Sequence, residues 1–432
     1  MTVPTTSTSS LLRKMSMNRS ARFAGAVAFA VVRSLSSSTL YLLTDIGHRV
    51  ALQQICLMSL AYLFSSPSSS SRSMSGLIGS SNKHPSYLDT IEPPETDSGP
   101  PTSIYKANAT LVMLARNSDI DGAVRSVRDM EDRFNARHGY PWVFLNEEPF
   151  SDEFKQRVGV LIRGQKQFGL VPKEHWHQPS WIDENKASEA RQKMVEDNII
   201  YGDSVSYRNM CRYNSGFFYR HELLQQYRWY WRVEPDVHFH CDILEDPFLF
   251  MQTHNKTYGF TITMYEFDKT IPTLWSAVRE FVQKYPQYVA KGNAMDFISE
   301  NNGESYNLCH FWSNFEIADL DFWRGEAYSA FFDHLDAKGG FYYERWGDAP
   351  VHSIAAALFA RKDQIHFFRE IGYEHNPYTH CPAEEDSWVR GRCACNRERS
   401  FGEFSHAIFA HGDRVTWIML TWVAQTTTAT PV

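Results

Sequence analysis

Two carboxylates lie two residues apart, directly after the most aromatic stretch of the chain. They are Glu234 and Asp236, on either side of Pro235, and they follow the segment YRWYWRV. Proline ends a strand and fixes a turn, so both carboxylates are expected at a strand end. Carboxylate oxygens suit a hard divalent ion, Mg²⁺ or Mn²⁺, whose open positions the oxygens of a nucleotide diphosphate can fill. A solvated turn is the alternative that so short a motif leaves open.

Three further segments combine aromatic residues with titratable side chains. FWSNFE places Glu316 among rings and amides, where a buried acid is costly unless it has a partner or a role. FYYERWGDAPVHS offers Asp348 and His352 at a predicted helix start, where Asp348 could equally serve as an N-cap. GYEHNPY places His375 in a predicted loop after a strand, where it could bind a metal or only form a hydrogen bond.

The elements that must position these residues alternate between strands and helices. The apolar run 109–115 predicts a strand, Ser118 and Asp119 begin a helix through about Arg137, and PWVFL (141–145) predicts a second strand. Further helices are expected over 151–162, 182–198, 271–285, 328–337 and 350–361, and strands over 227–233, 257–263 and 364–368. This order predicts an α/β fold with a doubly wound, Rossmann-like sheet and the ligand at the carboxyl ends of its strands. The absence of a GxGxxG motif argues against a dinucleotide site.

The sequence before the folded region has the pattern of a membrane tether. Six basic residues and one acid occur in the first fifty positions, which favours a cytoplasmic N-terminus. We predict a cytoplasmic region over 1–49, a signal-anchor over 50–64, a Ser/Pro-rich stem over 65–103, one catalytic domain over 104–400 and a divergent tail over 401–432. The apolar run is shorter than the roughly 20 residues that a spanning helix needs. A cleaved signal, a buried helix, or a disordered tail on a soluble protein are therefore alternatives.

Composition limits the partners and the compartment. The chain has 432 residues and a net charge of −7, which argues against a protein that binds nucleic acid through phosphate contacts. Of seven cysteines, Cys56 lies in the predicted anchor. The spacing of the other six does not match a zinc finger, so disulfides are expected, with the pairing left open. Those six are Cys211, Cys241, Cys309, Cys381, Cys393 and Cys395.

Long phrases of the chain resemble a known enzyme family in that family's order. ATLVMLARNSD, YWRVEPDV, CHFWSNFEI, GGFYYERWGDAPVHSIA and GYEHNPYTHCP are similar to the fungal Golgi α-1,2-mannosyltransferases, glycosyltransferase family 15. The likeness runs from about Tyr105 to Phe401 and stops there. It implies a type II Golgi membrane enzyme with a GT-A-like fold. It also implies GDP-mannose as donor and Mn²⁺ as cofactor. The implied reaction transfers mannose, with retention, to mannose of O- or N-linked glycans. Such a reaction contributes to protein mannosylation and to cell-wall mannoprotein synthesis.

The resemblance also implies roles for individual residues. The family's metal-binding carboxylate and histidine match Glu234 and His375. Its nucleophile or donor-face carboxylate matches Glu316, its candidate base matches Asp348, and a tyrosine near the donor matches Tyr207.

The side-chain chemistry adds phosphate-binding candidates. Tyr207 and Arg232 could hold phosphate oxygens, and Arg116 at a strand end is a further nucleotide-binding candidate. Two other functions fit the same residue types. One is a retaining glycosidase that uses Glu316 with Asp348, and the other is a membrane-tethered protein that binds glycans on its Trp and Tyr rings.

Overall fold

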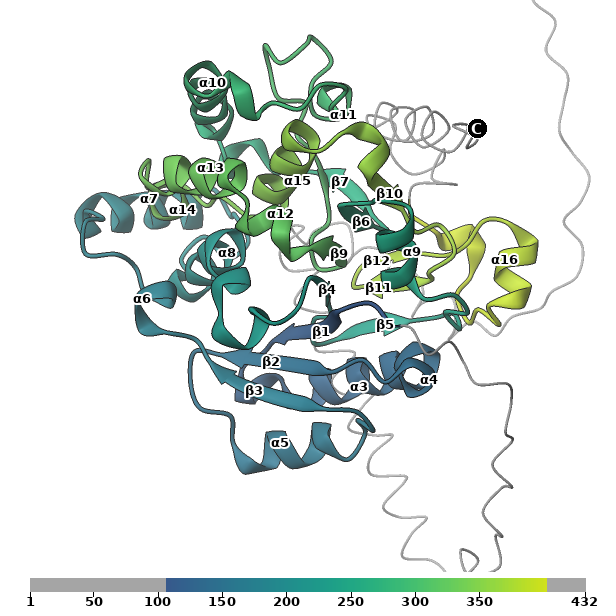
Figure 1. Ribbon diagram of the computed structural model, residues 1–432. Coiled ribbons are helices and arrows are strands. Elements are labelled where there is room, and N and C mark those ends of the chain that lie inside the picture. The colour runs from purple at the N-terminus through teal and green to yellow at the C-terminus, as the bar shows by residue number, and fades with distance from the viewer. Residues whose placement is uncertain (1–105, 402–432) are drawn as a thin grey trace, which may run out of the picture. The chain divides into compact units, whose positions relative to one another are not determined.

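The computed structural model of the protein describes residues 106–401, which Figure 1 shows in colour. The predicted cytoplasmic region, anchor and stem lie outside the described residues, and so does the predicted tail after Phe401. Within the described part of the chain, no helix is both long enough and apolar enough to cross a membrane.

A seven-stranded sheet organises the described residues, in the order β10-β6-β9-β4-β1-β2-β3. Neighbouring strands are parallel except at β9, which is antiparallel to both β4 and β6. The strands are β1 (Ala109–Leu114), β2 (Trp142–Asn146), β3 (Lys166–Leu170), β4 (Trp229–Arg232), β6 (Tyr258–Phe260), β9 (Glu316–Asp319) and β10 (Ile365–Phe367). Inner strands such as ATLVML are covered on both faces, which explains their continuous apolar sequence. The predicted mixed α/β sheet is confirmed.

Helices cover both faces of this sheet (Figure 1). One face carries α3 (Ile120–Met130), α4 (Ala136–His138), α5 (Asp152–Gly159) and α9 (Pro247–Thr253), with a π-helical turn (Glu131–Asn135) joining α3 to α4. The other face carries α6 (Lys173–Trp176), α7 (Glu184–Glu196), α8 (Val205–Gly216), α10 (Leu274–Lys284), α11 (Met295–Ile298), α12 (Leu320–Arg324), α13 (Glu326–Asp336), α14 (Gly340–Tyr343) and α15 (Asp348–Phe359). Alternate residues of a strand face opposite layers: Leu111 packs with α3, and Val112 packs on the α8 and α15 side.

The antiparallel strand β9 brings distant residues together. Its register with β4 pairs Glu316 with Arg232, at the end of β4 where YWRVEPD leaves the sheet. The β1 and β4 strands run in parallel, with Val112 opposite Arg232. Glu316 therefore lies at the carboxyl ends of the neighbouring parallel strands, although it begins its own strand.

Two small antiparallel sheets complete the fold. One has the order β12-β11-β5, and the other pairs β7 with β8. Their strands are β5 (Val237–Phe239), β11 (Tyr373–His375), β12 (Tyr378–His380), β7 (Thr263–Tyr265) and β8 (Cys309–Phe311). The single strand expected over 257–263 is therefore wrong, because the chain leaves the large sheet after Phe260 and begins a second strand at Thr263. His375 ends strand β11 and does not lie in a loop.

Disulfides join the three-stranded sheet to the segment around α16 (Glu385–Arg390). The bonds are Cys241–Cys393 and Cys381–Cys395. The expectation of disulfides is thus confirmed for four cysteines and wrong for two. Cys211 in α8 and Cys309 in β8 are free thiols. They are buried in the apolar layer on the α8 and α15 side of the sheet, apart from the cluster that the four bonded cysteines form.

Candidate active site

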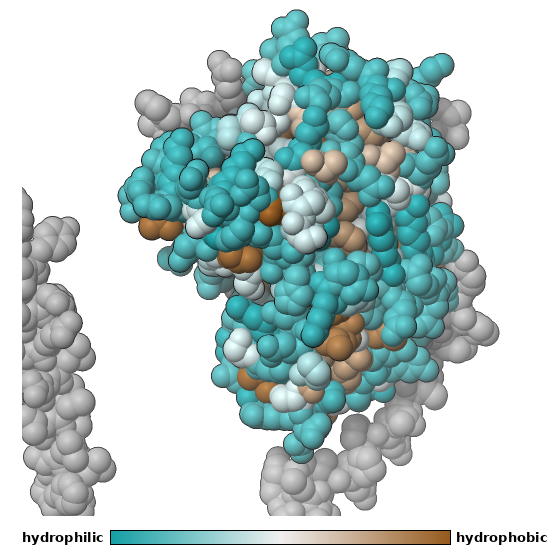
Figure 2. Space-filling view, turned by 90° about the vertical axis from the view of Figure 1, so that its left-hand side faces the viewer, coloured by the Kyte–Doolittle hydropathy of each residue, from teal (hydrophilic) through white to brown (hydrophobic). Residues whose placement is uncertain are grey.

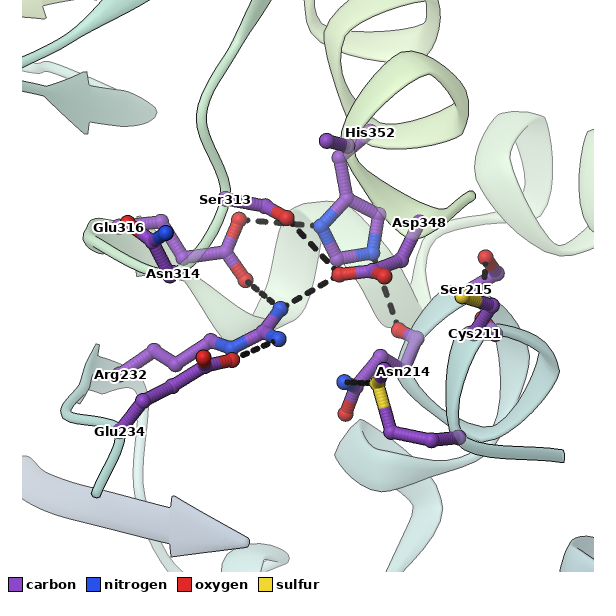
Figure 3. Close-up of polar contacts among 12 residues, drawn as sticks. Cys211, Asn214, Ser215, Arg232, Glu234, Ser313, Asn314, Glu316, Asp348 and His352 are labelled. Atoms are coloured by element: carbon purple, nitrogen blue, oxygen red, sulfur yellow. Dashed lines mark hydrogen bonds and ion pairs between the residues drawn. The ribbon is translucent and has the colours of Figure 1, made fainter. Parts of the chain in front are cut away.

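Arg232, the last residue of β4, lies among three carboxylates (Figure 3). Its Nη1 donates a hydrogen bond to Oδ2 of Asp348 at 2.6 Å, and its Nη2 donates one to Oε1 of Glu234. The same Nη1 lies 3.9 Å from Oε1 of Glu316. These acids come from three different parts of the sequence, and one guanidinium holds them together.

Burial and charge act in opposite directions on this group. Burial alone would lower the pKa of Arg232, but the carboxylates of Glu234, Asp348 and Glu316 raise it well above its ordinary value. Burial alone would raise the pKa of Asp348, but Arg232, His352 and the Ser313 hydroxyl hold it below its ordinary value. Arg232 is therefore a permanent cation and Asp348 a permanent anion at neutral pH. Three formal carboxylate charges face one guanidinium, which suits the binding of a further cation.

The Glu316 carboxylate is buried and fully hydrogen-bonded. Glu316 is only 1% exposed. Its Oε1 accepts a hydrogen bond from the Tyr230 hydroxyl at 2.7 Å, and its Oε2 accepts one from the Tyr258 hydroxyl at 3.1 Å. Burial raises the pKa of both phenols well above the ordinary value, so they remain donors. The Trp323 indole donates to the Tyr230 oxygen at 3.0 Å and fixes that ring in turn.

His352 of α15 completes the surroundings of Glu316. Its Nδ1 lies 3.0 Å from Oε2 of Glu316, and its Nε2 lies 3.0 Å from the backbone oxygen of Asn214 (Figure 3). A backbone carbonyl can only accept, so Nε2 carries a proton. The contact between Nδ1 and Oε2 sets the imidazole of His352 directly against the Glu316 carboxylate. His352 is fully buried.

Asp348 is the first residue of α15, and its N-cap is Gly347. The alternative that Asp348 is itself an N-cap is therefore wrong. Its carboxylate instead accepts hydrogen bonds from Arg232 and, at 2.8 Å, from the Ser313 hydroxyl in the connection between β8 and β9. Asp348 thus fixes the guanidinium of Arg232 and the β8–β9 connection in one place.

Glu234 and His375 form the pair that is best placed to bind a metal ion. Oε2 of Glu234 lies 3.8 Å from Nε2 of His375, and their side chains are 26% and 31% exposed. The pairing of β11 with β5 sets His375 opposite Val237, just after the turn that carries Glu234. The Trp312 ring lies edge-on to the His375 imidazole, with centroids 5.0 Å apart. A carboxylate and an imidazole are both good ligands for Mn²⁺.

Asp236 has a different partner. It occupies a left-handed turn position with φ +61°, and its carboxylate pairs with Arg125 of α3. No group of three or more His, Cys, Asp or Glu residues between residues 106 and 401 is arranged to hold a metal ion. The described residues thus bring together two candidate metal ligands, Glu234 and His375.

Tyr207 of α8 lies in a second aromatic group. Its ring stacks on Tyr201 at 4.7 Å between centroids, and the guanidinium of Arg345 lies over it at 5.1 Å. The neighbouring Cys211 and burial raise the pKa of Tyr207 well above its ordinary value, so its hydroxyl is a hydrogen-bond donor at neutral pH. The buried Nε of Arg345 has no hydrogen-bond partner in the described structure.

Arg116 lies just after β1 and is largely exposed. Its guanidinium pairs with Asp119 at 3.1 Å, an interaction that raises its pKa. No described contact joins it to the Arg232 group. The structure thus brings together Arg232, Glu234, Glu316, Asp348 and His375. Arg116, Asp236 and Tyr207 instead have partners of their own.

Sequence analysis did not find Tyr230, Tyr258, Ser313 or Asn214. Tyr230 could have been found, because alternation in β4 places residues 230 and 232 on the same face of the strand. Tyr258 could not, since its contact with Glu316 depends on the pairing of β6 with β9. Ser313 and Asn214 likewise contact the site only through the tertiary fold.

The fold and the site define the class of protein. A mixed sheet with helices on both faces, and a group of acidic side chains at its strand ends, is the arrangement of a GT-A-like glycosyltransferase. The family model described as glycolipid 2-alpha-mannosyltransferase matches residues 72–408. The chain belongs to this family, glycosyltransferase family 15.

Relatives of known sequence agree with this assignment. The chain is 55% identical over 301 residues to glycolipid 2-alpha-mannosyltransferase 2 of Candida albicans. The matched region covers 70% of this chain and 65% of the relative. It is 52% identical over 302 residues to alpha-1,2 mannosyltransferase KTR1 of Saccharomyces cerevisiae, and this match covers 70% of the chain and 77% of that protein. The chain thus spans about two thirds to three quarters of the length of these relatives.

Solved structures show the same fold. Core-mannan synthase A (CmsA/Ktr4) of Aspergillus fumigatus, in a Mn/GDP form, superposes with a TM-score of 0.65 at 43% identity, covering 69% of this chain and 82% of that one. The mannosyltransferase Ktr4p of S. cerevisiae, in complex with GDP, gives a TM-score of 0.66 at 42% identity, covering 68% and 77%.

Proposed function

We propose that the protein is a retaining α-1,2-mannosyltransferase that moves mannose from GDP-mannose to mannose of O- or N-linked glycans. The observation that carries the proposal is the Glu234 and His375 pair beside the Arg232 group, at the strand ends of a family 15 fold. A homologous structure holds Mn and GDP, and the relatives are named as mannosyltransferases.

Glu234 and His375 are the residues that would hold Mn²⁺. Their carboxylate and imidazole fit its ligand preference, and both side chains are accessible to a ligand. The ion would neutralise charge on the departing GDP. Arg232 fixes the Glu234 carboxylate through its Nη2, so the ligand is oriented before the ion binds. Asp236 supports the turn through Arg125 rather than serving as a ligand.

Asp348 is better suited to orienting groups than to removing a proton. Its pKa is held below its ordinary value by Arg232, His352 and Ser313, so it is a weak base. We propose that it holds Arg232 and orients a sugar hydroxyl. An oxygen of the departing phosphate then accepts the proton of the acceptor hydroxyl, as the new glycosidic bond forms and the bond between mannose and phosphate breaks.

Glu316 contributes fixed negative charge to the site. Its oxygens accept hydrogen bonds from Tyr230 and Tyr258 and contact His352, and the residue is almost fully buried. A carboxylate so held stabilises positive charge on a sugar in the transition state without reorganising. Attack on the anomeric carbon would first require these contacts to break, which favours electrostatic stabilisation over a covalent intermediate.

The same geometry does not favour a glycosidase. Such an enzyme needs two carboxylates that flank the scissile bond, one of them protonated. Here Glu316 and Asp348 are both buried and share the guanidinium of Arg232. No observation favours a glycan-binding protein without catalysis.

Location and partners extend the proposal. We propose a single-pass type II protein of the Golgi membrane with residues 104–400 in the lumen. The basic N-terminal flank, the apolar run over 50–64 and the Ser/Pro-rich stem support this topology. A relative that is 51% identical over 309 residues is named O-glycoside alpha-1,2-mannosyltransferase omh1 of Schizosaccharomyces pombe, which supports mannose-terminated O-glycans as acceptors. Tyr207, Arg232 and Arg116 are the proposed contacts of the nucleotide phosphates.

Transfer from GDP-mannose to a defined α-mannoside tests the function. We expect a product whose new bond is α-1,2-linked, as shown by linkage analysis, and which forms only with a divalent ion. Release of free mannose from the mannoside without GDP-mannose would instead show a glycosidase.

A further inference from the structure

The described residues contain two tripeptides of the form Asn-x-Thr, the acceptor sequence for N-linked glycans in proteins of the secretory pathway. They begin at Asn108 and Asn255. A third tripeptide of this kind, Asn18-Arg19-Ser20, lies in the predicted cytoplasmic region. The proposed topology would expose the first two to the glycosylation machinery and shield the third.

Asn255 lies on the surface with its side chain free. It lies two residues after the end of α9, adopts a left-handed conformation with φ +51°, and is exposed. No hydrogen bond engages its side-chain amide in the described structure. The backbone on both sides is held, since the Lys256 amide donates to Met251 at 2.8 Å and the Thr257 amide to Gln364 at 2.7 Å. The asparagine is thus presented on an ordered turn with its amide free to carry a substituent.

The turn at Asn255 lies at the end of the sheet opposite the active site. The next residues enter β6, and the Thr257 oxygen accepts a hydrogen bond from the Asp319 amide at 3.0 Å. Asp319 is the last residue of β9, whereas Glu316, the first, pairs with Arg232. A glycan on Asn255 would therefore leave the entrance for donor and acceptor open.

Asn108 is placed differently. Its side-chain Nδ2 donates to the Gln226 oxygen at 2.8 Å, just before β1. Thr110 of the same tripeptide is fully buried, with its hydroxyl on the Pro141 oxygen. The Asn108 side chain thus joins the segment before β1 to the segment before β4.

We propose that Asn255 carries an N-linked glycan. Its Nδ2 forms a bond to the anomeric carbon of an oligosaccharide carried on a lipid diphosphate. The bond from that carbon to the diphosphate breaks, and the amide loses one proton. This inference rests on the proposed luminal placement of residues 104–400, and it goes beyond the transfer reaction itself.

The test uses the full chain expressed in a fungal cell. The matched variants are Asn255→Asp, which keeps a residue that tolerates the left-handed turn, and Thr257→Ser, which keeps the acceptor sequence. We expect N-glycosidase treatment to increase the gel mobility of the wild type and of Thr257→Ser. Before this treatment, Asn255→Asp should migrate as a form with one glycan fewer than the wild type. In the wild type, release of the glycan should convert Asn255 to aspartate, which mass spectrometry of the peptide that contains this residue detects. Asn255→Asp should transfer mannose at the wild-type rate.

Two readouts separate this inference from the proposed function. If residues 104–400 are protected from protease in sealed vesicles and the Asn255 peptide is unmodified, the glycan inference is wrong while the proposed topology stands. If the domain is accessible to protease and unmodified, both are wrong. A glycan on the Asn108 peptide alone would also overturn the assignment to Asn255. Mannose transfer is measured separately on each sample.

Discussion

Arg232 determines the chemistry of the site at the scale of single residues. Its guanidinium contacts Glu234, the proposed metal ligand, and Asp348, and it lies near Glu316. A planar group with several donors can hold carboxylates on different sides, which a lysine cannot do. The charges of the site are thereby fixed before any substrate binds.

Glu316→Gln should separate catalysis from folding. If Glu316 stabilises positive charge on the sugar, the variant should lower kcat by about 10²-fold or more and change the KM for GDP-mannose little. Binding of GDP should survive. Single-turnover rates measured beside Tm check this prediction. A much lower Tm with a normal rate per folded molecule would show that Glu316 serves only to pair with its neighbours.

The stability that the fold loses in Asp348→Asn should depend on pH, because the ion pair with Arg232 requires an ionised Asp348 carboxylate. The pKa of Asp348 is lowered in the folded state, so the carboxylate stabilises the fold above its unfolded pKa, about 4, and this contribution is lost as the pH falls through the lower folded value. Removing one partner of a buried pair typically costs about 3 kcal/mol.

Unfolding by denaturant across a pH series measures the difference between wild type and Asp348→Asn. We expect a constant difference between about pH 5 and about pH 7, and a smaller one below about pH 4. A difference that is independent of pH throughout would mean that the charge of Asp348 does not stabilise the fold.

At the scale of elements, the long apolar segments could be predicted and the short polar ones could not. The strand over 109–115 and the helices over 271–285 and 350–361 correspond to β1, α10 and α15. The continuous apolar runs and helical spacing of these segments indicate their structure regardless of tertiary contacts.

Two elements that build the site were not predicted. Helix α8 buries polar residues such as Arg208 and Arg212, so its sequence shows no clear apolar face. Strand β9 has four residues, and only its pairing with β4 and β6 holds it in the sheet. Glu316, Asp348 and Arg232 could thus be predicted as site residues, but the contacts that join Arg232 to both acids could not.

The three-stranded sheet positions His375, and disulfides hold that sheet. Cys381 follows β12 and pairs with Cys395, and Cys241 follows β5 and pairs with Cys393. A disulfide typically stabilises a fold by about 2 to 4 kcal/mol. Replacing Cys381 and Cys395 by Ala should therefore lower Tm and weaken the apparent affinity for Mn²⁺, because His375 loses its fixed place.

A matched substitution controls for the loss of a thiol. Cys309→Ala removes a buried free thiol from the other side of the large sheet and should leave the Mn²⁺ affinity unchanged. Equal Mn²⁺ affinities in the Cys381→Ala/Cys395→Ala double variant and the wild type would contradict the proposed link between the disulfide and the metal site.

At the scale of the whole molecule, the proposed anchor and stem are separable from the catalytic domain. The described residues 106–401 contain the Arg232 group and the apolar clusters on both faces of the large sheet. A chain that lacks residues 1–103 should therefore be soluble and should transfer mannose at a rate close to that of the full chain. Sedimentation after cell lysis and a transfer assay measure both properties. Recovery of the native full chain entirely in the soluble cytosolic fraction would overturn the proposed topology.

The central claim is that Glu234 and His375 bind a divalent ion that holds GDP. Calorimetric titration of the full chain in detergent with GDP, with and without Mn²⁺, tests it most directly, using Glu234→Gln and Asp236→Asn as a matched pair. We predict Mn²⁺-dependent GDP binding in the wild type and in Asp236→Asn, and a loss of that dependence in a folded Glu234→Gln protein. Equal GDP binding with and without Mn²⁺ in the wild type, or an unchanged Mn²⁺ dependence in Glu234→Gln, would contradict the account.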